Sequence, residues 1–527
     1  MSCAKSVKVA LFNSNVFCRV AVCVSLAVVN EFIINNGTEP QSLDPSKIEG
    51  VPEHRIYMAL FEGLVSYDPK TSAAIPGVAE SWTRSNNDTV ITFKLRDAQW
   101  SDGEKITAQT FVDSWLYYLA PETAAVYAYM PAMIIKGATE YNAGTGSAAD
   151  VGIRAIDEKT FEVTLVGPLA YAVDMMAHYS FAPLPLHAMK KYGEDWIKPG
   201  NLVGNGPFTL ESWTPQQSLT VIPNEKYWNK DEVYLDRITF LTIENETTAY
   251  QKYKAGEMDW DTSAPQEMLE EIKLREDYQT GPQLSSYYYY LNTENPVLAD
   301  VRVRKALTMS IDRDELVNKV TKGGEIPSGG YVPTMTGYDA ITGNTFDLVK
   351  AQSLLAEAGF PNGEGFPKLT LIYNTNEGHK KIAEYVQQAW KKNLGIDIEL
   401  ANLEWATFLD ERQGGNFEIG RAGWTGDYQD PSNFLELFLT GGGNNDGRYS
   451  NPEFDALLEK AAKMPAGAER FEVLRQAEEI LITQDQAIIP FYFYVTKNMI
   501  DLNKWDGWYT NTLDIHPYVG LKAKVIN

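Results

Sequence analysis

Cysteine is almost absent from this chain. Its 527 residues include only Cys3, Cys18 and Cys23, all close to the N-terminus. No disulfide can therefore hold the main body of the fold, and a cysteine nucleophile is excluded there. Domains without cysteine occur in both reducing and oxidising compartments, so the number of cysteines does not determine where the protein is located.

The sequence also lacks the common catalytic and cofactor motifs. It has no GxSxG elbow, no Walker A loop and no GxGxxG turn. Neighbouring carboxylates are numerous, but among 70 acidic residues such pairs are usually solvated and do not indicate a glycosidase or an aspartic dyad. We therefore expect no catalytic activity, no metal ion and no cofactor. No HExxH or other close metal-ligand spacing occurs among the histidines, which are His54, His178, His187, His379 and His516.

Positive charge is in deficit. Lys and Arg number 46 against 70 Asp and Glu, which gives a net charge of −24, and we find no basic run, so nucleic acid is not an expected partner.

Hydrophobic residues at 44% and charged residues at 22% are ordinary for a soluble globular protein. The length predicts roughly two to four domains. Aromatic residues, at 12%, are typical of large recognition pockets and also of large cores.

The N-terminal segment, residues 1–30, is interpreted as an imperfect export signal. Two lysines precede an apolar stretch at 16–29, which is too short to span a membrane and carries Arg19. Val20–Cys23 loosely resembles the site before a lipid-modified cysteine, so lipidation at Cys23 is one possibility. The alternative is a wrongly assigned start codon, with the true chain beginning near Glu31.

Hydrophobic periodicity predicts a mixed α/β protein. Residues 90–95 and 160–165 alternate as half-buried strands do. Residues 367–424 read as β-α-β-α-β, with a helix that Gly395 ends, and this order predicts a mainly parallel sheet covered by helices. Ligands of such sheets lie beyond the carboxyl ends of the strands, so Thr425–Tyr428 is a candidate site from topology alone.

Several short motifs occur together in one order. The chain resembles the periplasmic oligopeptide-binding proteins of ABC importers, the bacterial extracellular solute-binding family 5. Any one motif is weak evidence, but their joint occurrence across about residues 31–500 is specific. The motifs are NNGTEPQSLDP at 35–45, LFEGL at 60–64, PGVAESW at 76–82, WSDG at 100–103, NGPF at 205–208, DVRVR at 300–304 with IDR at 311–313, and RAGWTGDY at 421–428.

The resemblance implies a type II periplasmic-binding-protein-like clamshell, in which two α/β lobes close on the ligand and an additional α/β domain is inserted in the first. Lobe I would comprise residues 31–62, 186–283 and 496–527, the inserted domain 63–185, and lobe II 284–495. The resemblance further implies that the chain crosses between the lobes near Tyr287–Tyr290 and Phe491–Tyr494.

A receptor for many different peptides must hold their charged ends and their main chain. In the family, the aspartate of the WxxDY block pairs with the peptide α-ammonium group, and this position is Asp427. A carboxylate in a closed, water-poor cleft is strongly favoured by such a partner. The alternative is that Asp427 caps the helix that follows. Glu49, Gly50 and Val51 are expected to offer main-chain hydrogen bonds to the peptide.

Cations at graded distances would meet the carboxylates of peptides of different length. The family uses the positions of Arg421, Arg412 and His379 in this way, while Lys322 fits only after a one-residue shift of register. As alternatives, such an arginine pairs with a structural carboxylate, and such a histidine is a core or surface residue.

The remaining candidates line the expected cleft. Trp424 borders a side-chain pocket or simply belongs to the core. Gly423 and Thr425 are also placed at the site, with only main-chain contact expected at Thr425, where the best-known relatives carry cysteine. Of the two aromatic runs, Tyr288 and Tyr494 are expected to face the ligand, because strand alternation sends half of each run into the core.

The leading hypothesis is a non-enzymatic receptor that delivers short peptides to a membrane permease. It would be a monomer in the periplasm, or attached by a lipid to the outside of the cytoplasmic membrane. Within the same class, the solute could instead be a dipeptide, murein tripeptide, haem or nickel. From another class, a peptidase or a chaperone-like module is opposed by the missing catalytic motifs.

Overall fold

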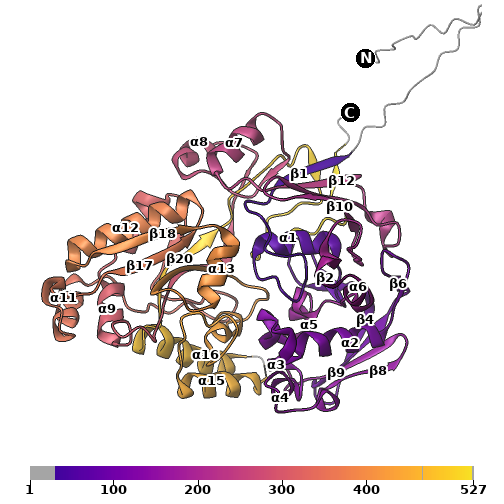
Figure 1. Ribbon diagram of the computed structural model, residues 1–527, viewed down its shortest axis with the longest axis horizontal. Helices are drawn as coiled ribbons and strands as arrows, with labels where there is room; N and C mark the ends of the chain where they lie inside the picture. The colour runs from indigo at the N-terminus through magenta and orange to yellow at the C-terminus, as the bar shows by residue number, and fades with distance from the viewer. Residues whose placement is uncertain (1–29, 466, 525–527) are drawn as a thin grey trace, which may run out of the picture.

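The structure is a computed structural model that describes residues 30–465 and 467–524. The proposed export signal and Cys23 lie outside the described residues. Figure 1 shows two halves side by side: indigo to magenta elements form the first half on the right, and mostly orange elements form the second half on the left. No helix in the described part has both the length and the apolar character that crossing a bilayer requires.

The first half is built on a seven-stranded sheet that combines distant parts of the sequence. Its central strand β1 (Glu31–Asn35) runs parallel to β12 (Arg237–Leu241) and to β13 (Trp260–Asp261). Phe32 and Ile34 of β1 are fully buried, which explains the alternating pattern of this strand. The other strands, in sheet order β10-β11-β12-β1-β13-β21-β14, are β10 (Phe208–Thr214), β11 (Ser218–Pro223), β21 (Asn498–Ile500) and β14 (Tyr278–Gln279).

A separate four-stranded antiparallel sheet completes the first half. Its order is β4 (Ala79–Ser85), β5 (Val90–Leu95), β9 (Thr160–Thr164) and β8 (Ile153–Asp157). The strands predicted at 90–95 and 160–165 are thus confirmed as β5 and β9. Helix α2 (Ala108–Leu119) packs against this sheet, and its Trp115 contacts Phe161 of β9 edge to face.

The second half contains a six-stranded sheet with helices around it. The predicted β-α-β-α-β run is confirmed as β17 (Leu369–Asn374), α12 (Glu377–Leu394), β18 (Ile398–Leu403), α13 (Trp405–Gln413) and β19 (Ile419–Thr425). Gly395 ends α12 with a left-handed φ of 72°, a conformation that glycine adopts without strain. Other helices of this half include α9 (Val301–Met309), α11 (Leu348–Glu357), α15 (Pro452–Ala462) and α16 (Ala468–Glu479).

The six-stranded sheet is mixed rather than mainly parallel. Strand β17 is parallel to β18 and β19, as expected. However, β15 (Pro282–Leu291) is antiparallel to both β19 and β20 (Ile488–Val495), and β16 (Ile326–Pro327) is antiparallel to β20. The expectation was wrong for this part because β15 brings the chain in from the first half and β20 leads it back, so these two neighbouring strands run in opposite directions.

The chain passes between the halves at two neighbouring points. Residues 280–281 connect β14 of the first half to β15, and residues 496–497 connect β20 to β21 of the first half. The N–H group of Thr496 donates to the carbonyl of Gly281 at 2.9 Å, so the two connections lie side by side. The predicted positions, Tyr287–Tyr290 and Phe491–Tyr494, are instead inside paired strands. The lobe boundaries proposed from the sequence stay a prediction.

Candidate functional site

A cavity of about 320 Å³ lies between the two halves and is lined by residues from both. Strand β19 and the loop after it supply one side, and helix α1 (Val51–Leu60) with the loop before it supplies the other. The structure brings together at this cavity the sequence candidates Glu49, Gly50, Val51, Tyr288, Arg412, Arg421, Gly423, Trp424, Thr425, Asp427 and Tyr494.

Asp427 follows the carboxyl end of β19 and has no cationic partner among the described residues. Its side chain is only 12% exposed. Its one hydrogen-bond donor is Asn433, whose Nδ2 lies 3.3 Å from Oδ2 of Asp427. Burial raises the pKa of Asp427 to about 7, against a smaller lowering effect of the Asn433 hydrogen bond. An unpaired carboxylate is therefore enclosed in the cavity wall.

The alternative role of Asp427 as a helix cap is wrong. The next helix, α14 (Ser432–Leu435), begins five residues later, and the Ser432 N–H group donates to Oδ1 of Asp430 at 3.0 Å. The Asp430 carboxylate also forms a buried ion pair with Arg470. Asp430 therefore performs the structural role, and Asp427 remains available to the cavity.

His178 lies beside Asp427 and was not found from the sequence. Its Nε2 is 3.4 Å from Oδ1 of Asp427, and its ring is fully buried. The Nδ1 atom accepts the N–H group of Ser180 at 3.3 Å, so the proton of the neutral ring is on Nε2 and faces the carboxylate. Burial, with a smaller effect of His54, lowers the pKa of His178 well below its usual value and keeps the ring neutral.

Arg421, on β19, is a cation without a carboxylate partner in the described part of the chain. Its Nη2 donates to the hydroxyl of Tyr494 at 2.8 Å and its Nη1 to Oδ1 of Asn374 at 3.3 Å, while its buried Nε has no partner. Its guanidinium carbon lies 5.0 Å from the centre of the Tyr287 ring. The alternative of pairing with a structural carboxylate is thus wrong for Arg421.

Arg412, in contrast, is used by the protein itself. Its Nε donates to the Asp446 carboxylate at 2.5 Å, and its Nη2 lies 3.4 Å from Oε1 of Glu49, a residue of the first half. Burial raises the pKa of Glu49 to about 7, although the charge of Arg412 acts in the opposite direction. This Glu49–Arg412–Asp446 cluster joins the two halves, which is the structural alternative for Arg412.

Two further candidate cations do not line the cavity. His379 lies near the start of α12 with its ring 5.6 Å from that of Tyr287. Burial, followed by the charge of Arg421, lowers its pKa well below the usual value, so the ring is neutral at neutral pH. Lys322 is exposed, and its carbonyl accepts a hydrogen bond from Lys273. The shifted register that would place Lys322 at the site is wrong.

Aromatic side chains shape the cavity wall. The tyrosines of β15 alternate as expected: Tyr288 and Tyr290 line the cavity, and Tyr287 and Tyr289 pack into another core cluster. The hydroxyl of Tyr288 donates to that of Tyr290, which donates to the carbonyl of Asn444. Trp424 both lines the cavity and is nearly buried, stacked on Tyr127 with ring centres 6.0 Å apart.

One face of α1 also borders the cavity. Its residues are Val51, His54, Arg55 and Met58, which follow the i, i+3, i+4, i+7 spacing of a single helix face. The helical spacing of these residues is visible in the sequence. However, a helix face that mixes Val, His, Arg and Met does not by itself indicate a ligand-binding surface.

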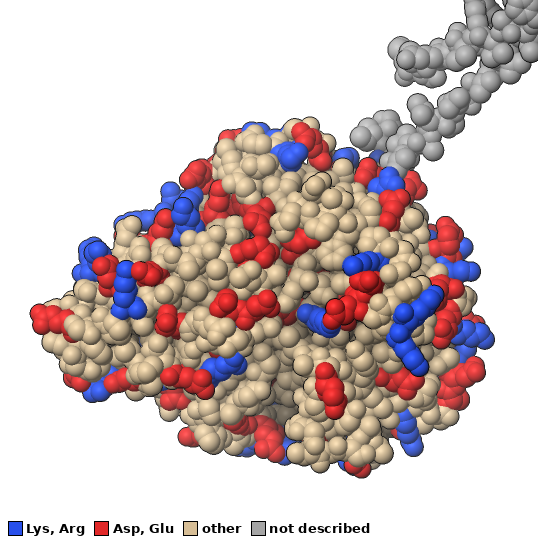
Figure 2. All heavy atoms as spheres, in the orientation of Figure 1, with Lys and Arg blue, Asp and Glu red and all other residues tan. Residues whose placement is uncertain are grey.

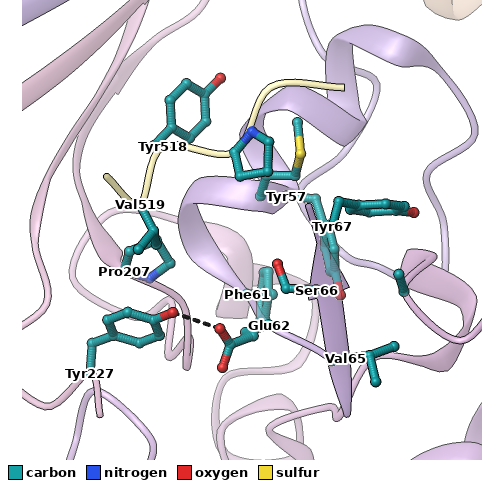
Figure 3. Close-up of a pocket in the computed structure, with 14 residues that line it drawn as sticks. Tyr57, Phe61, Glu62, Val65, Ser66, Tyr67, Pro207, Tyr227, Tyr518 and Val519 are labelled. Atoms are coloured by element: carbon teal, nitrogen blue, oxygen red, sulfur yellow. Dashed lines mark hydrogen bonds between the residues drawn. The ribbon is translucent and has the colours of Figure 1, made fainter. Parts of the chain in front are cut away.

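Met58 separates this cavity from a much smaller one. Figure 3 shows the small cavity, where the Tyr227 hydroxyl points at the Glu62 carboxylate, which accepts it at 2.6 Å. Burial raises the pKa of Glu62 to about 7, against the lowering effect of hydrogen bonds from Tyr227 and Trp228. A volume of about 30 Å³ admits only water-sized molecules, so this cavity is no candidate for a larger ligand.

Residues 73–446 match the family model described as bacterial extracellular solute-binding proteins, family 5 Middle. The chain belongs to this family. It is 40% identical over 500 residues to the periplasmic oligopeptide-binding protein OppA of Escherichia coli (strain K12), covering 92% of this chain and 91% of that protein. The resemblance inferred from the motifs is therefore confirmed.

Solved structures of family 5 proteins share the fold. A periplasmic oligopeptide-binding protein (OppAIV) from Borrelia burgdorferi superposes with a TM-score of 0.91 at 38% identity, covering 94% of this chain and all of that one. Haemophilus influenzae OppA in complex with RPPGFSPFR gives 0.90 at 34% identity, covering 94% and 99%. The expected α/β clamshell is confirmed.

A pair of structures of one relative indicates the state of the clamshell. The murein tripeptide-binding protein MppA of Escherichia coli superposes with a TM-score of 0.90 at 36% identity, covering 95% of this chain and 99% of that one. Its unliganded open form reaches only 0.62 at the same identity, covering 94% and 98%. The halves of the present structure are thus arranged differently from those of the open form, and we call this arrangement closed.

Ligand-free protein should open more as the pH rises. Burial in the closed structure raises the pKa of Asp427 from 3.8 to about 7, so this state binds the proton more tightly than an open state in which water reaches the carboxylate. Closure without ligand therefore becomes less favourable between about pH 4 and pH 7, by up to about 4 kcal/mol. We expect a larger radius of gyration by small-angle scattering at about pH 8 than at about pH 5.

The variant Asp427→Asn should reduce this pH effect, because the amide does not ionise. Some effect should remain, since the pKa of Glu49 is raised in the same direction. The exposed Asp231→Asn is the matched control and should behave like the unmodified protein. If the radius of gyration of Asp427→Asn changes with pH as much as that of the unmodified protein, ionisation of Asp427 does not control opening.

Proposed function

We propose that this protein captures short peptides in the cavity between its halves and delivers them to the permease of an ABC importer. The observation that carries the proposal is the presence, in one cavity, of a carboxylate and a guanidinium that each lack an oppositely charged partner in the described chain, Asp427 and Arg421. A free peptide carries the two complementary charges on its ends.

Strand β19, which carries Arg421 and ends just before Asp427, has about the length of a short extended peptide. Residues 421, 423 and 425 alternate with the buried residues of β19 and border the cavity. The strand advances by roughly 3.3 Å per residue, so Arg421 and Thr425 are about 13 Å apart along it. An extended peptide of about four residues has this length. We infer that the peptide α-ammonium group meets Asp427 and the terminal carboxylate meets Arg421.

One edge of β19 is free between these charges. Strand β15 pairs with β19 along Ile419–Thr425, whereas β17 pairs only with Ile419 and Gly420, so the other edge beyond Gly420 has no strand partner among the described residues. An incoming peptide could therefore pair with β19 as an added strand, with Glu49, Gly50 and Val51 facing it from the other half. Side chains would then point into the space bounded by the aromatic residues, which places few demands on their identity.

Two relatives support this proposal. The Escherichia coli relative is an oligopeptide-binding protein, and the Haemophilus influenzae structure contains a nonapeptide. We further propose that the present protein is an exported monomer, periplasmic or lipid-anchored, that binds peptides without cleaving them. Figure 2 shows acidic and basic side chains interspersed on one face, without a continuous basic patch.

Replacing Asp427 by alanine should remove most of the affinity for peptides. Loss of one partner of a buried ion pair costs roughly 3–5 kcal/mol, or about two to four decades in the dissociation constant. Calorimetry with a mixed pool of tri- and tetrapeptides measures the effect, and circular dichroism checks the fold. A loss of less than about threefold with an unchanged spectrum would exclude the α-ammonium assignment.

The terminal carboxylate and Arg421 should be energetically coupled. Arg421→Ala is expected to weaken one peptide length more than others, because the guanidinium sits at a fixed position on β19. Amidating the peptide C-terminus should then have little further effect in the variant. A double-mutant cycle by calorimetry gives the coupling, and additive losses would mean that the two groups do not interact.

Peptide binding should close the halves about the paired connections at residues 280–281 and 496–497. A ligand drives closure only by contacting the closed state better, as a peptide between Asp427 and Glu49–Val51 does. Small-angle scattering should therefore show a smaller radius of gyration with peptide, and mass spectrometry should recover the peptide intact. If the radius of gyration is unchanged at saturating peptide, the clamshell mechanism is wrong. If the repurified protein still cleaves the peptide, the protein is an enzyme.

A further inference from the structure

Arg55 of α1 is a second cation at the cavity, and it lies on the half opposite Arg421. It borders the cavity on the same helix face as Val51, His54 and Met58. Its Nε is buried without a partner, and no described residue accepts a hydrogen bond or forms an ion pair with its guanidinium. An arginine has five N–H donors in a rigid fork, and a donor that is buried without a partner, as Nε is here, is costly.

The nearest acids do not satisfy Arg55. Asp514 and Asp261 act on it through charge, which partly offsets the lowering of its pKa by burial. Asp514, which also lines the cavity, accepts from His516 at 2.9 Å and from Asn498 at 2.8 Å, both on Oδ1. Asp261 accepts Nδ2 of Asn35 on Oδ1 at 3.1 Å, and its buried Oδ2 has no partner. The two carboxylates therefore act on the guanidinium through their charge without binding its donors.

Other contacts of Arg55 fix its position without using its donors. Its guanidinium carbon lies 5.8 Å from the centre of the Trp260 ring. The adjacent His54 is buried, and its Nε2 also lacks a partner. Burial, with a smaller effect of Arg55, lowers the pKa of His54 to about 4, so its ring is neutral. The only full charge on this face of α1 is then that of Arg55.

We infer that Arg55 is a second carboxylate-binding subsite, which takes either an acidic side chain of the bound peptide or the terminal carboxylate of a longer one. The inference rests on the proposed function, because it assumes a peptide in the cavity. It is independent of Arg421, which belongs to β19 of the other half. A guanidinium with its whole fork free prefers a planar carboxylate, which it can bind through two parallel hydrogen bonds.

The first experiment needs no variant. Alanine peptides of four to six residues, each with one glutamate, are compared by calorimetry with the matching glutamine peptides, and unsubstituted alanine peptides are compared with their C-terminal amides. Glutamate should bind roughly tenfold tighter than glutamine at one position if a side chain is the ligand. If the terminal carboxylate is the ligand, amidation should weaken one of the longer peptides by a similar factor.

The second experiment assigns the preference to Arg55. Arg55→Gln should abolish it, and Arg55→Lys should retain part of it, since lysine keeps the charge but not the fork. The matched control Arg237→Gln removes an exposed arginine of the first half that is bound to Glu211, and it should leave the preference unchanged. Arg421→Ala should also leave the side-chain preference unchanged.

Two results would overturn the inference. The first is that the unmodified protein binds the alanine peptides but binds glutamate and glutamine peptides equally and free acids and amides equally. A preference for the free acid that Arg421→Ala removes would belong to Arg421 and would not support the inference. The other is an equal loss for the glutamate and glutamine peptides in both Arg55 variants, which indicates a purely structural role. Failure of the proposed function is recognised separately, because then the unmodified protein binds none of these peptides.

Discussion

Enclosing unpaired charge between two halves is the constraint on which the rest of this structure depends. Asp427 and Arg421 lie in one cavity, yet the protein gives neither an oppositely charged partner in its described part. Burying such groups is costly unless a complementary charge is present. Asp427 and Arg421 therefore make the closed state unfavourable when it is empty. The same two groups make it favourable when a zwitterionic ligand is bound. Affinity and conformational change thus have one physical origin.

The contacts between the halves include ion pairs, hydrogen bonds and stacked aromatic rings. Glu49 meets Arg412, and Trp405 of α13 donates to Glu53 of α1 at 3.2 Å. The covalent connections lie next to each other at residues 280–281 and 496–497, so the halves can rotate about this point without breaking either sheet. Stacking of Trp424 on Tyr127 and of Tyr428 on Tyr171, with ring centres 6.0 and 5.0 Å apart, adds apolar contact that opening would expose to water. The ionisable contacts lose less, because water replaces them.

Much of this could be predicted from the sequence, for identifiable reasons. Alternating apolar residues reveal β5 and β9, and the helical stripe with Gly395 at its end reveals α12, because local periodicity determines which faces are buried. Topology, which places ligands after strands such as β19, indicated the segment Thr425–Tyr428, and the family resemblance selected Asp427 within it. His178 could not be found: it reaches Asp427 across 249 residues of sequence, and a lone histidine carries no spacing signal. The free donors of Arg55 depend on where the neighbouring acids lie relative to its guanidinium, and only tertiary packing decides that.

The structure does not keep the graded series of cations that the family resemblance implied. Arg412 is bound by Asp446 and Glu49, His379 is held neutral, and Lys322 is exposed outside the cavity. The cations left at the cavity, Arg421 and Arg55, stand on opposite halves. Under the proposed function, a peptide held at Asp427 would meet Arg421 along β19 or Arg55 by crossing to α1. The length of a peptide and its direction across the cavity would then be linked, because the two arginines lie on different walls.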